Sequence, residues 1–315
     1  MKEMNNKVHV EGRLYEADLE KRVTGKDSKN PGTEYIAGTI SIATDNAMTN
    51  IILVHYTYVT AVTSKKKPDT RYPVLQDIID GKIKTVMRDG VDNASMLRVD
   101  SAINLNEFYS DRNGAEELVS QKRNEGGFIH VTNQLSDDEN LRNTFDCDMI
   151  ITSTRRIDAN EERNLPEKMV LKGAIFNGYN GNYRLLPVEF SVLLPGAMNY
   201  FESLDASNTN PVFTRIKGNQ ISQTIVRKIA EESAFGEPSV REVTSSSKDY
   251  VVNWAQKEVY DWDDESTITV NEFKKCISDR EIYLAEKKKR DDAYRASKAA
   301  PAAAPAATTV GGFNF

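Results

Sequence analysis

Three stretches near the N-terminus decide the fold: residues 8–15 read VHVEGRLY, residues 35–42 read YIAGTISI, and residues 51–59 read IILVHYTYV. In the first two, apolar residues alternate with other residues, and the third is dense in β-branched and aromatic residues. A period of two residues over this length predicts β-strands. The segments between them, GKDSKNPG at 25–32 and DNAMTN at 45–50, carry turn residues. We therefore expect a meander of three antiparallel strands.

Glycines interrupt two of these strands. Gly12 lies in the first and Gly38 in the second, and a residue without a side chain inside a strand usually marks a bulge or a tight bend. Three consecutive antiparallel strands that coil at internal glycines are typical of the start of a small Greek-key barrel. The meander therefore predicts a barrel.

The segments after the meander continue this pattern. Apolar residues recur at helical spacing from Tyr72 to Arg88, with Gly81 weakening the middle, and predict a helix. Met96–Phe108 alternates as a strand, and Phe128–Thr132 is a short strand that follows a polar loop over Ser110–Gly127. Three strands, a helix and two strands are the order expected of an OB-type barrel, in which the helix closes one end.

The second half of the chain repeats this style. Pro195–Ser203 predicts a short helix, and the strands that we expect are Phe145–Ile157, Met169–Asn177, Arg184–Leu194, Phe213–Ile221 and Val251–Trp254. The two halves share no clean sequence repeat, so a second barrel follows from element order alone, and one elaborated barrel with long insertions is the alternative. The expected fold class is mainly β with minor α, built on OB-fold-like Greek-key barrels.

The C-terminal region differs in composition from the rest. Thr269–Arg295 predicts a charged helix, and AAPAAAPAA at 299–307 is too poor in bulky residues to build a core. The chain then finishes TTVGGFNF. We expect four segments: an OB-like domain at 1–135, a second β-rich domain or elaboration at 144–262, the helix at 266–296, and a disordered linker with its tip at 297–315.

Composition and charge narrow the function class. The chain has 315 residues and a formal net charge of −6, which argues against a protein that coats nucleic acid through bulk positive charge, although a local basic groove can coexist with acidic faces. No apolar run approaches the ~20 residues that a membrane span requires, and the polar N-terminus lacks a secretory signal. Two distant cysteines, Cys147 and Cys276, support neither a disulfide scaffold nor a zinc site. We expect a cytoplasmic protein that needs no cofactor and no membrane.

Aromatic and basic residues share strand faces. A period of two places Phe213, Arg215 and Lys217 on one face, where an aromatic ring can stack a base and the cations can neutralise phosphates. Ordinary strand aromatics and solvated cations are the competing interpretation. Basic loops such as Lys65–Lys67 and Gln121–Arg123 are candidate walls of a groove for the phosphate backbone. The candidate nucleic-acid-binding residues are Arg13, Tyr15, Tyr35, Tyr56, Tyr58, Arg98, Phe108, Phe128, Arg155, Arg156, Phe213, Arg215 and Lys217.

Signatures of catalysis are scarce. The three histidines, His9, His55 and His130, fall on separate strands without a metal-ligand partner at suitable spacing, and the chain lacks a P-loop, a GxGxxG turn and a GxSxG elbow. Carboxylates cluster in loops, as in DWDDE at 261–265, whereas a two-metal nuclease needs them to converge from several strands. We therefore expect a binding protein and not an enzyme.

The combination of a β-barrel body, an Ala/Pro tether and an apolar tip resembles phage-type single-stranded DNA-binding proteins. The segments VHVEGRLYE, EYIAGTISIATD and PVFTRIKGNQIS are similar to stretches of phage proteins of this kind. Bacterial single-stranded DNA-binding proteins end in a short acidic peptide that finishes in Pro-Phe and recruits replication and repair proteins. Here Phe313 and Phe315 supply the aromatic tip, and Phe315 matches in type and position, but the acidic run and the penultimate proline are missing.

The resemblance and the shared strand faces together indicate sequence-independent binding of single-stranded DNA in replication or recombination. Aromatic residues would stack bases, Arg and Lys would hold phosphates, and the tip at Phe313 and Phe315 would recruit replication or recombination proteins. A structural or assembly protein with self-associating β domains, for example in a virion, is one alternative, and a metal-dependent nuclease is another. The choice between DNA and RNA and a homo-oligomeric state stay open.

Overall fold

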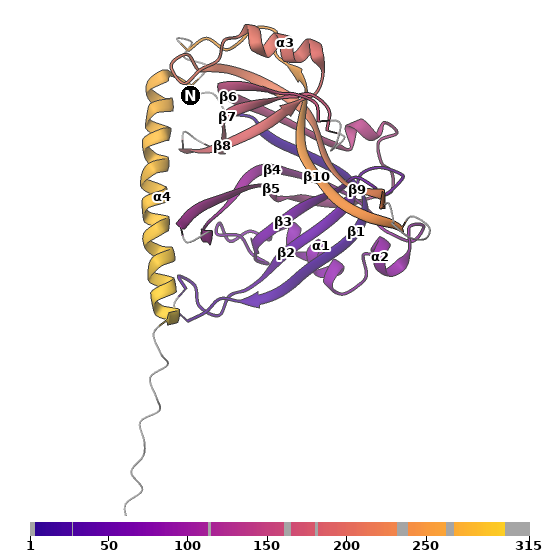
Figure 1. Ribbon diagram of the computed structural model, residues 1–315. Helices are drawn as coiled ribbons and strands as arrows, with labels where there is room; N and C mark the ends of the chain where they lie inside the picture. Colours follow the sequence, from indigo (N-terminus) through magenta and orange to yellow (C-terminus); the bar gives the residue numbers. More distant parts are fainter. Residues whose placement is uncertain are drawn as a thin grey trace, which may run out of the picture.

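The expected meander forms at the N-terminus, where β1 (Asn6–Val23), β2 (Glu34–Ala43) and β3 (Ile51–Val59) pair antiparallel in sequence order. The structure is a computed structural model and describes residues 4–26, 28–112, 115–160, 165–179, 182–231, 239–262 and 268–299. Figure 1 shows how its elements are arranged. The other elements are α1 (Arg71–Ile79), α2 (Val86–Asp89), β4 (Met96–Arg112), β5 (Ala115–Thr132), η1 (Glu139–Leu141), β6 (Asn143–Ile157), β7 (Lys168–Tyr179), β8 (Asn182–Val192), α3 (Pro195–Ser203), β9 (Val212–Glu231), β10 (Ser239–Ala255) and α4 (Val270–Ala299).

The first five strands close into a barrel. β3 pairs in parallel with β5, β5 pairs antiparallel with β4, and β4 pairs antiparallel with β1. Because β1 also pairs with β2, the order β1-β2-β3-β5-β4 returns to its start. Each strand of the ring is therefore paired on both edges over at least part of its length. A closed five-stranded ring with a helix between its third and fourth strands is the arrangement of an OB-fold. We call these strands, with α1 and α2, barrel one.

The next five strands repeat the same order. β6, β7 and β8 form a second antiparallel meander, β8 pairs in parallel with β10, β10 with β9, and β9 returns to β6. The helix α3 lies between β8 and β9 in the chain, as α1 and α2 lie between β3 and β4. We call this ring barrel two. The OB-like fold is therefore confirmed, in its tandem form and not as one elaborated barrel.

The two barrels are joined through their first strands. β1 pairs antiparallel with β6, from Asn6 opposite Cys147 to Val10 opposite Asn143, so all ten strands belong to one hydrogen-bonded sheet. The buried apolar residues inside the two rings form one continuous core. The segment between the barrels packs on barrel one, where the buried Arg142 donates to the carbonyl oxygen of Ser136 and to Asn46 Oδ1. The boundaries of the expected domains stay a prediction.

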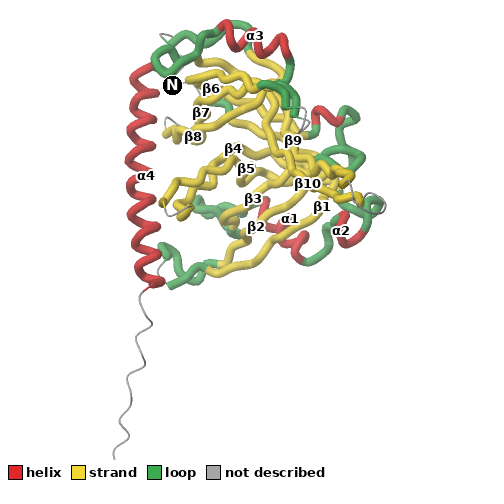
Figure 2. The backbone as a smooth tube through the Cα atoms, viewed as in Figure 1, coloured by secondary structure: helices red, strands yellow, loops and turns green. Residues whose placement is uncertain are grey.

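The C-terminal helix α4 runs along one side of the molecule, past the strands of both barrels (Figures 1 and 2). Its first part packs on barrel two through Phe273 and Cys276. Further along, Arg280 pairs with Glu107 of β4, and Lys288 and Arg295 both pair with Glu116 of β5. The charged helix that the sequence predicts therefore ties barrel two to the β4–β5 hairpin of barrel one.

Some expected elements differ from the observed ones. The helix expected at Tyr72–Arg88 is interrupted, because Gly81 has φ +75° and ends the run between α1 and α2. The polar loop expected at Ser110–Gly127 is largely strand. β4 and β5 pair from Met96, which lies opposite Thr132, to Arg112, which lies opposite Ala115. This hairpin contacts α4 through ion pairs at Glu107 and Glu116, so its sequence is polar and reads as a loop.

Both glycines of the meander lie where another backbone strand approaches closely. A Cβ atom added to Gly12 would lie 2.0 Å from the carbonyl oxygen of Ala43, and one added to Gly38 would lie 2.0 Å from that of Asp18. Gly38 also has φ +139°, which other residues rarely adopt. Gly38 also lies at a register shift between β2 and β3, so the expected bulge is confirmed there, whereas Gly12 allows the close approach of Ala43.

Candidate nucleic-acid interface

The outer face of β2 and β3 carries a pair of aromatic rings. Tyr35 and Tyr58 lie with ring centroids 4.7 Å apart and ring planes tilted by 41°. Tyr58 is 45% exposed, and Tyr35 is half-buried. Flat rings held against each other on a strand surface offer a platform on which a nucleobase can stack.

A β-bulge puts Tyr58 on this face, whereas Tyr56, which precedes the bulge, points into the barrel. Gly38 pairs with Tyr56 and Ile36 with Val59, so β3 uses one residue more than β2 between the two pairs. Thr57 and Tyr58 both point outward, whereas Tyr56 is 1% exposed and belongs to the core. Burial raises the pKa of the Tyr56 hydroxyl. Tyr56 is therefore removed from the candidate residues, because it alternates with Ile52 and Val54 on the buried side, and the bulge separates it from Tyr58.

Polar and charged groups surround the aromatic pair. Arg22 stands opposite Tyr35 in the β1–β2 register and pairs with Glu20 at 2.9 Å. On the other side, Arg123 of β5 lies between Glu125 and Thr57, with Nη2 donating to Glu125 Oε1 at 3.0 Å. The β1 edge of the face is acidic, since Glu16, Asp18 and Glu20 are exposed there. An anionic strand that contacts the two tyrosines is therefore favoured on the β3–β5 side.

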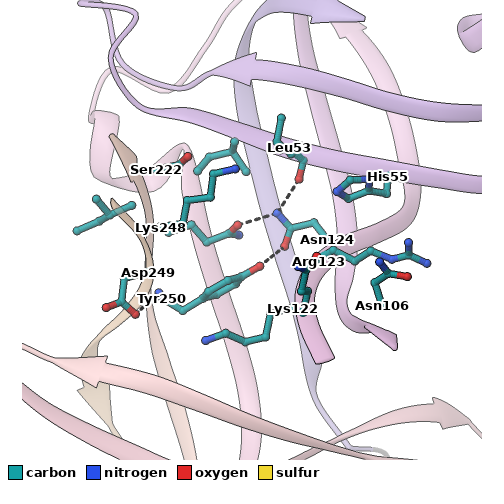
Figure 3. A pocket seen from close by; sticks show the side chains of 14 residues that line it. Leu53, His55, Asn106, Lys122, Arg123, Asn124, Ser222, Lys248, Asp249 and Tyr250 are labelled. Atoms are coloured by element: carbon teal, nitrogen blue, oxygen red, sulfur yellow. Dashed lines mark hydrogen bonds between the residues drawn. The ribbon is translucent and has the colours of Figure 1, made fainter. Parts of the chain in front are cut away.

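A cavity opens on that side, between barrel one and the β9–β10 hairpin of barrel two (Figure 3). Its volume is about 550 Å³, and it is lined by Ile52, Leu53, His55, Asn106, Gln121, Lys122, Arg123, Asn124, Gln220, Ile221, Ser222, Lys248, Asp249 and Tyr250. In this wall Arg123 is paired with Glu125 and Asp249 with Lys168, at 3.0 and 3.1 Å, and Asp249 also accepts from the hydroxyl of Ser191. Lys248 is exposed, and burial lowers the pKa of Lys122 to about 8. The cavity wall therefore carries an excess of positive charge.

The positive charge of this wall affects the pKa of His55. Its ring lies 2.9 Å from the hydroxyl of Thr39. The pKa of His55 is lowered first by burial, then by the charges of Arg123 and Lys248, with Glu125 opposing them. Of the residues around the cavity, sequence analysis had singled out only the Gln121–Arg123 segment, as a basic loop. It is part of β5.

The β9 residues do share one face, but the aromatic residue among them is covered. Phe213 is fully buried beneath Tyr260 and Trp262, with ring centroids 4.5 and 5.8 Å away. Arg215 donates to both carboxylate oxygens of Asp146 at 2.6 Å, and Lys217 lies 3.7 Å from the same carboxylate. Phe213 is removed from the candidate residues, because a segment distant in sequence packs on it. The two cations are already neutralised by Asp146.

The remaining candidates are spread over other surfaces. Arg98 pairs with the buried Glu11, its Nη2 atom 2.8 Å from Oε2. Arg156 pairs with Glu167 at 3.1 Å and with Glu202 at 3.4 Å. The others are wholly or partly exposed and lie on β1, β4, β5 and β6, away from the tyrosine pair: Arg13, Tyr15, Phe108, Phe128 and Arg155. The structure therefore concentrates only Tyr35 and Tyr58, of the candidates, beside the basic cavity.

Sequence analysis missed an exposed aromatic residue at the end of β10. Trp254 is 45% exposed, and Lys217 Nζ lies 4.8 Å from its ring centroid. The signal was present, because Val251–Trp254 was expected as a strand, but no basic residue adjoins it in sequence. The tip residues Phe313 and Phe315 lie outside the residues that the structure describes.

Two general features of the described ranges bear on function. Among these residues, no group of three or more His, Cys, Asp or Glu side chains is placed to hold a metal ion. None of the helices in the described part of the chain is long and apolar enough to cross a membrane.

Comparison with known proteins assigns the family. A family model described as YorF matches residues 5–290. The chain belongs to the YorF family. The search of curated proteins finds no match.

Two solved structures of the single-stranded DNA binding protein from Thermus aquaticus are similar to this YorF family member. A deletion mutant gives a TM-score of 0.43 at 10% identity, covering 83% of this chain and 98% of that one. The wild-type protein gives 0.41 at 10% identity, covering 82% and 95%.

Proposed function

We propose that the protein binds single-stranded DNA without sequence preference, along the outer face of β2 and β3 in barrel one. Tyr35 and Tyr58 stack bases, and the cations beside β5 and β10 hold the phosphate backbone. Binding involves no covalent chemistry. The observation that carries the proposal is the exposed Tyr35–Tyr58 pair next to a cation-lined cavity.

Sequence-independent binding of a single strand needs two kinds of contact. Aromatic faces accept any base, because every base has a π-face, and a positive groove tracks the backbone. Both kinds lie on one surface here, since His55 of the cavity wall is only three residues from Tyr58 on the same strand. At ~3.3 Å per strand residue, this spacing is roughly 10 Å. One strand can therefore contact both.

An uneven distribution of charge makes DNA binding compatible with a net charge of −6. Exposed acidic residues of this face lie on the β1 side, whereas on the cavity side Lys248 is exposed and the carboxylates of Glu125 and Asp249 are held in ion pairs with Arg123 and Lys168. A local potential of this kind orients a polyanion even on an acidic protein. Binding is then expected to weaken with salt, because each phosphate contact releases counterions.

The direct test is a fluorescence-anisotropy titration of a labelled dT oligonucleotide at low and high salt, beside a duplex of equal length. We expect binding to the single strand that weakens as salt rises, and weak binding to the duplex. Tyr58→Ala should weaken binding about tenfold, because base stacking on an aromatic residue contributes about 1–3 kcal/mol per base. This substitution should cost little stability, because Tyr58 is 45% exposed.

Phe128→Ala is the matched control. Phe128 is an aromatic residue on β5 that is 62% exposed and pairs with Asp100 of β4. We expect the Phe128→Ala variant to bind the oligonucleotide with an affinity within about twofold of that of the wild type. A loss of affinity with Phe128→Ala and none with Tyr58→Ala would move the interface to the β4–β5 side, and no binding at low salt would remove the DNA hypothesis.

The biological setting extends this proposal. We place the protein in replication or recombination, with the tip at Phe313 and Phe315 recruiting partner proteins. Deleting residues 308–315 should then leave the oligonucleotide titration unchanged and abolish capture of replication proteins. Equal capture by the truncated chain would contradict this role of the tip.

A further inference from the structure

The wall of the cavity between the barrels contains hydrogen-bonding groups in addition to the cations that a phosphate groove requires. It lies between β3 and β5 of barrel one and the β9–β10 hairpin of barrel two, and the two sides are linked by hydrogen bonds. Asn50 Nδ2 donates to the carbonyl oxygen of Gln220 at 3.1 Å, and the amide of Ser222 donates to Asn50 Oδ1 at 2.7 Å. The walls of the cavity are therefore held in place by contacts between the barrels.

A chain of hydrogen bonds fixes the orientation of the amides in this wall. The hydroxyl of Tyr250 bonds to Asn124 Oδ1 at 2.9 Å, so the amide nitrogen of Asn124 faces the other way. This nitrogen donates to the carbonyl oxygen of Leu53 at 3.1 Å and to Gln220 Oε1 at 2.7 Å. Figure 3 shows Asn124 and Tyr250 meeting across the cavity wall. Both amide oxygens, Asn124 Oδ1 and Gln220 Oε1, are used in this way, which leaves Gln220 Nε2 without a partner. This nitrogen is covered in the free protein, so a ligand reaches it when the Gln220 side chain turns toward the cavity.

The wall therefore has buried donors without acceptors. Gln220 is 3% exposed, and its Nε2 atom has no hydrogen-bond partner. Arg123 Nε is buried without a partner as well. A buried donor that is left unpaired is costly, so such groups in a cavity wall favour a ligand that brings acceptors. The ligand class is one rich in acceptor atoms.

The other lining residues define two further properties of the ligand. Lys248 is an exposed cation of this wall, whereas Arg123 is paired with Glu125 and the Lys122 amine bonds to the carbonyl oxygen of Glu189. The exposed charge favours an anion. Leu53 and Ile221, which are partly exposed, supply an apolar part that can hold a flat ring. A volume of about 550 Å³ lies in the range of small-molecule sites. An anionic group, an apolar ring and ring acceptors together describe a nucleotide.

We propose that this cavity is a nucleotide-binding site, in which the base lies against Leu53 and Ile221, a base acceptor receives the Gln220 amide, and the phosphate contacts Lys248 and Arg123. The proposal rests on the proposed function only for the source of the nucleotide. A strand bound at Tyr58 would supply one unit turned out of its stack, and a free nucleotide offers the same chemistry.

The first test is isothermal titration of the full-length protein with dTMP, with thymidine and inorganic phosphate as separate probes. We expect saturable dTMP binding that is tighter than that of either fragment. Gln220→Met, which keeps the length of the side chain, should weaken dTMP binding about tenfold. Lys248→Ala should weaken it about fivefold and should fold normally because Lys248 is exposed, whereas Tyr58→Ala should leave it unchanged.

A spectroscopic readout separates binding from a structural effect of the substitutions. His55 bonds to Thr39 of β2, and its pKa is lowered by burial and by the charges of Arg123 and Lys248, with Glu125 of β5 acting in the opposite direction. A bound phosphate would offset the charges of Arg123 and Lys248. Addition of dTMP should therefore raise the pKa of His55 in an NMR titration. The NMR signals of His9 and His130, which do not line the cavity, are the internal controls and should not change when dTMP is added.

The oligonucleotide arm distinguishes the two sources. If a strand supplies the nucleotide, Gln220→Met should weaken binding of a dT oligonucleotide as well as of dTMP. If only dTMP binding weakens, the cavity takes free nucleotides, and the site stands even where the DNA proposal fails. Absence of saturable dTMP binding, or dTMP affinity of Gln220→Met and Lys248→Ala equal to that of the wild type, would overturn the nucleotide site, whatever happens to oligonucleotide binding.

Discussion

The two barrels share one strand order and differ in what covers their outer faces. In barrel two, the outward residues of β6 to β9 include Ile150, Phe176 and Phe213, which form a second core with Phe273 and Cys276 of α4. In barrel one, the corresponding strands present Thr39, His55 and Tyr58 to the surface. One face is therefore closed by the chain itself, and the other is left open for a ligand.

The difference can be traced to the composition of the strands. Residues 169–176 of β7 read MVLKGAIF, a nearly continuous apolar run, as in strands that are buried on both faces. Residues 35–42 of β2 read YIAGTISI and alternate, as in strands with one solvated face. The apolar outer face of barrel two needs a cover, and α4 supplies it. In a tandem repeat of one fold, the face that lacks apolar residues is the one available for binding.

The largest expected effect comes from loosening this cover. Phe273→Ala removes a buried side chain from the contact between α4 and barrel two, where its ring lies 5.9 Å from that of Trp262. We expect a loss of about 3–5 kcal/mol in the free energy of unfolding, because truncation of a buried phenylalanine leaves a cavity. Urea denaturation followed by circular dichroism measures it.

Ile277→Ala is the matched control on the same helix, because Ile277 is 40% exposed. Its expected cost is below about 1 kcal/mol. If both substitutions cost the same small amount, α4 does not close barrel two, and the contrast between the two faces loses its basis.

A second effect concerns the opposite side of barrel one, where the segment before β6 covers Glu11. This carboxylate is fully buried and accepts from the backbone amide of Ser136 at 2.6 Å and from Arg98 at 2.8 and 3.0 Å. Burial alone would raise the pKa of Glu11, but the bonds from Ser136 and the bonds and charge of Arg98 outweigh it and leave the pKa lowered. The ionised form is therefore the stabilising one.

Glu11→Gln should accordingly destabilise the protein by about 1–3 kcal/mol at pH 7. Because the folded-state pKa is lowered, the contribution of ionised Glu11 is fully present above its ordinary pKa of 4.5 and is lost as the pH falls through the folded-state value. Thermal unfolding of both proteins from pH 7 to pH 3 tests this. A stability difference that grows toward acid pH would contradict the assignment.

Much of the fold could be predicted from the sequence, because element order and alternation are local properties. The meander, the helix at Pro195–Ser203 and the C-terminal helix were all evident from them. The binding face was predicted less well. A one-residue bulge separates Tyr56 from Tyr58, and Tyr260 and Trp262 cover Phe213 from a distant part of the chain. Neither a register shift nor a tertiary cover is visible in a period of two.

The cavity could not have been predicted for a related reason. Its residues come from β3, β4, β5, β9 and β10, which meet only because the barrels pair through β1 and β6. The decisive groups are the amides of Asn124 and Gln220, and amides in strands carry no recognisable motif. Sequence identifies the types of side chain that bind nucleic acid, whereas the pairing of the barrels decides which of them come together.

The smallest expected effect distinguishes free cations from paired ones. Lys248, on the open side, makes no ion pair with the described residues, whereas Arg215 on barrel two is held by both oxygens of Asp146. We expect Lys248→Ala to reduce the salt dependence of oligonucleotide binding, lowering the slope of log K against log salt by about 0.7, the value for one phosphate contact on a single strand. Arg215→Ala should leave the slope unchanged.

The measurement is the anisotropy titration repeated at several salt concentrations for each variant. An equal fall in slope for both variants would mean that DNA reaches the β9 face of barrel two in spite of Asp146, and the open and closed faces would no longer differ in function. A fall for Lys248→Ala alone would place the phosphate path on the side of barrel one that faces the β9–β10 hairpin. Charge pairing within the protein, and not the number of basic residues, would then decide where the strand binds.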